Sequence, residues 1–132
     1  MSRTAKTAFR CESWSEETID ETEGLAKMTR ASSKQTYSGD LEGESVLEYL
    51  MGYEEGGAAR FVGLERVTGT LHGKRGSFLF RLHGTYSDGV ARVHGTVVED
   101  SGSGELEGLS GAFRIETPHA ESYAVELDYE LG

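Results

Sequence analysis

Residues 76–99 read GSFLFRLHGTYSDGVARVHGTVVE, and this stretch decides the fold. Asp88-Gly89 lies between two runs rich in Phe, Leu, Val and Thr, which is a strong signal for a two-residue β-hairpin turn. The turn predicts the register of both strands, because side chains alternate between the two faces. One face is apolar and the other carries His and Arg. The predicted apolar pairs are Tyr86 with Ala91, Gly84 with Val93, Leu82 with Gly95, and Phe80 with Val97.

The rest of the chain repeats this pattern of short apolar runs separated by turns that contain glycine. The predicted strands cover residues 4–14, 26–38, 42–53, 59–71, 76–87, 90–99, 111–116 and 120–131. Eight strands joined by hairpins favour an all-β fold with a single closed antiparallel barrel over residues 1–132, because closure removes exposed sheet edges. A β-sandwich is the alternative. The acidic stretch at residues 15–25 has no apolar stripe, so it is predicted to be a loop at one mouth of the barrel.

Charge and composition exclude several classes of function. The chain has 23 Asp and Glu against 13 Lys and Arg, a net charge of −10, which makes it a poor candidate for nucleic-acid binding. It contains no apolar run long enough to span a bilayer, and its first residues lead into no secretory signal. Cys11 is the one cysteine and cannot form an internal disulfide. We therefore expect a cytoplasmic protein without a membrane or nucleic-acid partner.

Two further turns predict a pair of carboxylates inside the barrel. An even-numbered loop around Gly73-Lys74 would put Glu65 opposite Leu82 on the apolar face, and an even loop in residues 54–57 would add Glu48 to that face. Burial and mutual repulsion raise the pKa of such a pair, so Glu48 and Glu65 are candidate general acid and base residues. The alternative is a structural ion pair, for which Arg30 is the best-placed partner.

An apolar lumen with a few polar groups is typical of a site for a small molecule. The candidate ligand contacts are Arg30, Phe61, Phe80, Tyr86 and Trp14, although a single tryptophan at a strand end can also plug a barrel.

No metal or cofactor is expected from the sequence. His83 and His94 are predicted cross-strand neighbours, but zinc takes three or four protein ligands, and Arg81 and Arg92 beside them would repel a cation. The glycine-rich stretch at residues 102–111 is followed by no Lys-Ser or Lys-Thr pair and no helix, so it predicts a tight turn rather than a phosphate site.

Five motifs resemble a known family. They are TRA at 29–31, YSGDLEGES at 37–45, EYLM at 48–51, FVGLER at 61–66 and GSGELEGLSG at 102–111. Together they are similar to family 3224 of the bacterial domains of unknown function, from about Ala5 to Tyr129. The resemblance implies a small antiparallel barrel similar to that of plant allene oxide cyclases. It implies no activity, and no residue here matches a plant cyclase site closely enough to carry over.

Three functions remain open from the sequence. The protein could be a cofactor-free isomerase or cyclase that uses Glu48, Glu65 and Arg30 around an apolar substrate. It could be a lipocalin-like carrier that holds a small apolar molecule without converting it. It could also be a filled barrel that acts as an oligomeric interaction module. Residues 42–53 read as apolar on both faces, which predicts a homo-oligomer if one face lines the lumen and the other meets a second subunit.

Overall fold

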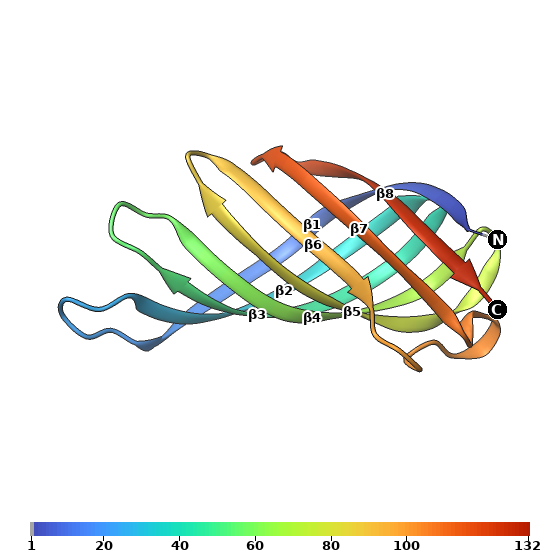
Figure 1. The fold of residues 1–132 in the computed structure, drawn as a ribbon, viewed down its shortest axis with the longest axis horizontal. Helices are drawn as coiled ribbons and strands as arrows, with labels where there is room; N and C mark the ends of the chain where they lie inside the picture. The colour runs from blue at the N-terminus through green and yellow to red at the C-terminus, as the bar shows by residue number, and fades with distance from the viewer. Residues whose placement is uncertain (1) are drawn as a thin grey trace.

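The computed structural model describes residues 2–132, which form a closed barrel of eight antiparallel strands. Each strand pairs with the next along the chain, and the last pairs with the first (Figure 1). The strands are β1 (Arg3–Asp20), β2 (Lys27–Gly39), β3 (Leu41–Tyr53), β4 (Ala59–Leu71), β5 (Lys74–Ser87), β6 (Val90–Val97), β7 (Leu109–Pro118) and β8 (Ser122–Leu131). The predicted all-β class and eight-stranded barrel are confirmed. The assignment of residues 1–132 to one domain stays a prediction.

The predicted acidic loop at residues 15–25 is wrong over most of its length. β1 continues through this stretch to Asp20 and pairs with β2 as far as Met28. The sequence pattern does not reveal this part of β1, because residues 10–20 are exposed and show no apolar alternation. Backbone hydrogen bonds to β2 hold the strand in place. Figure 1 shows the resulting β1–β2 hairpin projecting beyond the other strands.

The register of the β5–β6 hairpin is as predicted, with Ser87 beside Val90 and Phe80 beside Val97. Asp88 and Gly89 both have positive φ, as a two-residue primed turn requires. The β4–β5 turn also has an even loop, so Glu65 faces inward as expected. The pairing is nevertheless shifted by two residues, because the turn residues are His72 and Gly73, and Glu65 lies beside Phe80 rather than Leu82.

The β3–β4 loop overturns the predicted pair of inward carboxylates. Tyr53 pairs with Ala59, so the loop has five residues, an odd number. Gly56 and Gly57 both adopt positive φ, which lets the loop close with the Glu54 amide donating to the Ala58 carbonyl. The odd loop turns Glu48 to the outer face of β3, away from Glu65.

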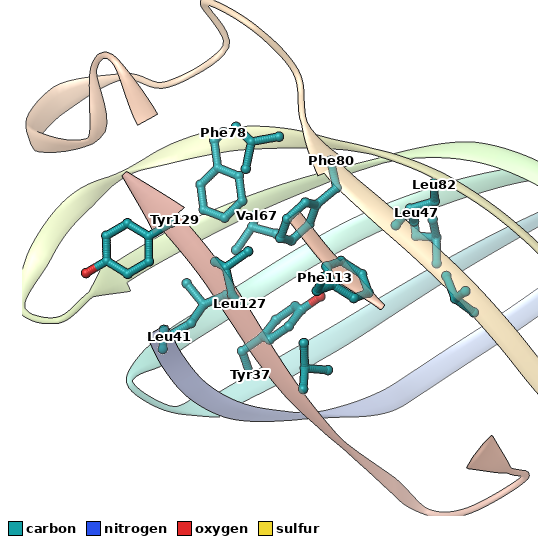
Figure 2. Packing of buried hydrophobic residues seen from close by; sticks show 14 of the residues in the cluster. Tyr37, Leu41, Leu47, Val67, Phe78, Phe80, Leu82, Phe113, Leu127 and Tyr129 are labelled. Atoms are coloured by element: carbon teal, nitrogen blue, oxygen red, sulfur yellow. The ribbon is translucent and has the colours of Figure 1, made fainter. Parts of the chain in front are cut away.

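One half of the barrel is packed solid, and we call it the closed half. Figure 2 shows Phe78, Val67, Phe80 and Leu127 gathered in this part of the interior. The Phe80 ring meets Phe78 and Phe113 edge-on, at centroid distances of 4.9 and 5.0 Å. The β6–β7 connection, with the short 3-10 helix η1 (Gly104–Leu106), folds over this end and buries Leu106 (Figure 1).

The outer face of β3 and β4 exposes a group of apolar side chains. Its members are Val46, Leu50, Val62 and Leu64. The inner face of β3 is the one with Leu47, Tyr49, Met51 and Tyr53, so both faces of this strand are indeed apolar. The homo-oligomer inferred from that pattern stays a prediction. Within residues 2–132 there is no helix of the length and apolar character needed to cross a membrane.

Candidate functional site

The other half of the barrel encloses a cavity of about 470 Å³, and we call it the hollow half. It lies toward the mouth formed by the β1–β2, β3–β4, β5–β6 and β7–β8 connections. Aromatic rings dominate the wall: Phe9, Trp14, Tyr49, Tyr53, Phe61, Tyr86, His119 and Tyr123. Besides the tyrosine hydroxyls, the Trp14 N–H and the His119 imidazole, the polar side chains in the wall come from Cys11, Gln35 and Thr117. Among residues 2–132, no Asp, Glu, Lys or Arg lines this cavity.

The cavity stays open because two large rings lie against the wall over glycines. A Cβ at Gly63 would stand 2.6 Å from Cδ1 of Tyr49, and a Cβ at Gly84 would stand 2.7 Å from Cζ of Phe61. The two rings also contact each other, at a centroid distance of 4.7 Å. Glycine at these strand positions therefore lets the rings sit back from the barrel axis.

Glu65 lies just beneath the floor of the cavity. It is the next inward side chain on β4 after Gly63, and only 2 % of its surface is exposed. Its Oε2 accepts hydrogen bonds from Tyr37 Oη at 2.8 Å and from Ser45 Oγ at 2.6 Å. Ser45 pairs with Gln35, which is part of the cavity wall. The hydroxyl cluster therefore forms the layer that separates the hollow half from the closed half.

Burial sets the protonation of this layer. Desolvation raises the pKa of Glu65, and the two hydroxyl donors offset only part of that effect. Burial, with the charge of Glu65 as a second cause, also raises the pKa of Tyr37 and Tyr49, so both phenols are neutral, and Tyr37 donates to Glu65.

A second carboxylate, that of Glu16, lies at the rim of the cavity and accepts hydrogen bonds from residues of its wall. Glu16 Oε2 accepts hydrogen bonds from Tyr53 Oη at 2.5 Å and Thr29 Oγ1 at 2.7 Å, and its Oε1 accepts one from Trp14 Nε1 at 3.1 Å. Burial opposes ionisation of Glu16, but these hydrogen bonds together outweigh it and lower the pKa. The ionised carboxylate thus fixes two rings of the wall, and it raises the pKa of Tyr53, which burial also raises, to about 12.

The structure brings together some of the sequence-predicted site residues and separates others. Trp14, Phe61 and Tyr86 line the cavity. Trp14 does not plug the barrel, because 48 % of its surface is exposed. Phe80 packs in the closed half and does not reach the cavity.

Glu48 and Arg30 lie outside the barrel. They form an exposed ion pair at 3.2 Å, and Ser32 also donates to Glu48. These hydrogen bonds, from Ser32 first and then from Arg30, lower the pKa of Glu48. The alternative of a structural pair with Arg30 is therefore what the structure shows for Glu48, on the outer face. Arg30 does not reach the lumen.

The sequence did not predict several of the residues that line the cavity. Tyr49 and Tyr53 share an apolar face in the sequence, but the wrong loop parity assigned that face to the outside. Phe9 and Tyr123 are cross-strand partners whose rings stack at 5.0 Å. The alternation of apolar with small or acidic residues from Tyr123 to Leu131 is a sequence signal that could have marked Tyr123 as inward. His83 and His94 stack as outer-face neighbours at 4.9 Å, and the described part of the chain holds no group of three potential metal ligands.

A lateral slot adjoins the cavity. The β7–β8 ladder ends at Ala112 and Asp128, although β7 continues to Pro118 and β8 begins at Ser122. A second cavity of about 540 Å³ lies between these unpaired stretches. Ile115 and Thr117 line both cavities, so the two adjoin at this side of the barrel.

Comparison with known proteins places this barrel in a family. No curated protein matches the chain. It is similar to a crystal structure of a protein with unknown function from the DUF3224 family of Shewanella oneidensis MR-1, with 28 % identity and a TM-score of 0.76 over 100 % of this chain and 98 % of that one. The family model described as "Protein of unknown function (DUF3224)" matches residues 5–129. The barrel also fits the likeness to allene oxide cyclases, which these comparisons do not test. The chain belongs to the DUF3224 family.

Proposed function

We propose that this protein binds a small, largely aromatic or apolar molecule in the hollow half of its barrel. The observation that carries the proposal is the cavity of about 470 Å³, which lies within the size range of small-molecule sites. Its wall offers aromatic faces for dispersion and stacking, and only a few polar groups to orient a ligand. A filled barrel acting only through its outer surface needs no such space.

Retention without conversion is the form of this function that the geometry favours. The acid–base pair expected from the sequence does not exist in the barrel, because Glu48 lies outside. Glu65 is inside but is covered by the wall and engaged by Tyr37 and Ser45. General acid–base chemistry needs a group within hydrogen-bond reach of the substrate. A carrier or ligand-sensing role therefore fits better than an isomerase or cyclase.

The test is a titration with N-phenyl-1-naphthylamine, a neutral fluorescent probe. Trp14 is the one tryptophan and lies in the wall, so energy transfer from Trp14 reports binding in the cavity. Ala91→Phe puts a ring into the wall, and we expect it to weaken probe binding at least tenfold. Ala112→Phe adds the same ring on the exposed outer face of β7 and is the matched control, with unchanged binding expected.

Two results would contradict the proposal. One is a wild-type protein that shows no saturable energy transfer to the probe. The other is an Ala91→Phe variant that folds and binds the probe as tightly as the wild type. Native mass spectrometry of gently purified protein adds a complementary observation, since a discrete extra mass that disappears on denaturation would give the chemical class of a retained ligand.

A further inference from the structure

Glu65 is a buried carboxylate without a countercharge. Among residues 2–132, no Lys, Arg or His forms an ion pair with it, and the basic residues at inward register, Arg3, Lys27 and Lys74, are each the first residue of their strand. Tyr37 and Ser45 both donate to Oε2, and no protein group of the described chain donates to Oε1. A buried carboxylate is stable when it is neutral or when it is paired with a cation, and no cation of the described chain pairs with Glu65. Glu65 does not itself line the cavity, but its donor Ser45 pairs with Gln35 of the cavity wall, so a ligand cation in the cavity would lie across this layer from the carboxylate and would favour its ionised form.

The wall above Glu65 suits a positive charge. Aromatic faces attract cations through their quadrupoles, and Tyr53 already holds the Lys27 ammonium 5.1 Å from its ring centroid at the rim. Glu16 accepts hydrogen bonds from Tyr53 and Trp14, which makes both rings richer in electron density. No Lys or Arg lines the cavity among the residues that the structure describes, and the basic groups nearest to it are His119 in the wall and Lys27 at the rim.

We propose that the cavity selects cationic ligands with an aromatic or apolar body, namely amines or quaternary ammonium compounds whose charge compensates Glu65. The inference rests on the proposed function, because it names the ligand class of the same cavity. The apolar body fills the aromatic wall, and the positive charge lies over the floor, toward Glu65. An anionic ligand of the same shape would place its charge toward the carboxylate, with no Lys or Arg in the described cavity wall to compensate it.

The experiment compares two probes of similar shape and opposite charge. 2-Naphthyltrimethylammonium and 2-naphthalenesulfonate each compete with bound N-phenyl-1-naphthylamine, and their dissociation constants are obtained from the displacement. We expect the wild-type protein to bind the ammonium probe at least tenfold more tightly than the sulfonate. Glu65→Gln should remove most of that preference and leave the affinity for the neutral probe within about twofold, because the amide keeps the shape of the side chain but carries no charge.

Glu48→Gln is the matched control. It removes one negative charge from the same pair of strands, but on the outer face, and we expect the preference for the ammonium probe to persist. If Glu65→Gln fails to fold, a wild-type protein without a preference for the ammonium probe still overturns the inference. A sulfonate bound as tightly as the ammonium, or an equal loss of preference in Glu48→Gln, overturns the inference. If the neutral probe binds and the charge preference is missing, only the inference falls, whereas the proposed function falls as well if no probe binds.

Discussion

The closed and hollow halves of the barrel are built from the same eight strands, yet only one is filled. In the closed half, Phe78 and Phe80 project into the interior and meet other large side chains. In the hollow half, Tyr49 and Phe61 lie against the wall over Gly63 and Gly84. Side-chain size alone therefore does not decide whether a small barrel is filled. Rings lie over inward glycines in both halves, since Phe113 lies over Gly95, and the closed half is filled because Phe78 and Phe80 pack across its interior.

The substitution for which we expect the greatest change tests whether the closed half contributes more to stability than the hollow half. Phe80→Ala removes a ring that is packed on both edges, and we expect a loss of about 3–5 kcal/mol in the free energy of unfolding. Phe61→Ala should lose clearly less, because its ring already borders empty space and its removal creates little new cavity. Urea unfolding of both variants measures the difference. Equal losses at the two positions would show that the hollow half is packed as tightly as the closed half.

A smaller effect comes from the glycines that hold the hollow half open. Gly84→Ala places a Cβ 2.2 Å from the Arg92 carbonyl oxygen and 2.7 Å from the Phe61 ring, so both the β6 backbone and the ring must shift. We expect a loss of about 1–3 kcal/mol of stability together with weaker binding of the neutral probe. Gly52→Ala is the control, because a Cβ there meets no atom within 4 Å and its φ is not in the left-handed region.

One result would contradict the role of Gly84 in keeping the cavity open. If Gly84→Ala binds the probe as the wild type does, the position of the Phe61 ring does not keep the cavity open. Circular dichroism and thermal unfolding of Gly84→Ala and Gly52→Ala show whether any loss of binding comes from a rearranged ring or from a protein that no longer folds.

The two carboxylates expected to form a pair should respond to pH in opposite directions. The pKa of Glu65 is raised in the folded protein, chiefly by burial beside Tyr37, Ser45 and Tyr49. Its contribution to stability is therefore present below its ordinary pKa of 4.5 and is lost as the pH rises through the folded value. The pKa of Glu48 is lowered, so its contribution is present above 4.5 and is lost as the pH falls through the folded value.

Urea unfolding from about pH 5 to about pH 8 checks the sign for Glu65. The wild type should lose stability with rising pH over part of this range, and Glu65→Gln should flatten that decline. Glu48→Gln should keep the wild-type slope there. A Glu65→Gln variant with the same pH dependence as the wild type would mean that Glu65 does not titrate inside the barrel.

The smallest effect is expected on the outer surface. Arg30→Gln removes the ion pair with Glu48, whose partners are both exposed, and exposed pairs contribute little. We expect no measurable change in the unfolding midpoint or in probe binding. A clear loss of binding in Arg30→Gln would return Arg30 to the ligand site where the sequence placed it.

The sequence was sufficient to predict the barrel and the register of the β5–β6 hairpin. It was not sufficient where the register depends on whether a loop has an odd or an even number of residues. Asp88-Gly89 admits one short turn, so the β5–β6 pairing followed from two residues. The segment from Glu54 to Ala58 closes as a five-residue loop through two glycines with positive φ, and no local pattern distinguishes that from an even loop. Because this loop has an odd number of residues, Glu48 lies on the outer face of β3. Tyr49 and Tyr53 lie on its inner face, although the sequence did not predict them to line the lumen. The cavity itself depends on ring positions over Gly63 and Gly84, which no sequence pattern reports.

Cys11 offers the most direct test of a ligand in the hollow half. It is the one cysteine of the chain, it is exposed, and it belongs to the cavity wall. We would measure the rate of its alkylation by iodoacetamide with and without saturating N-phenyl-1-naphthylamine. We expect the bound probe to slow the reaction at least severalfold. An unchanged rate while the probe is bound would place the probe elsewhere and contradict the assignment of the lumen as the binding site.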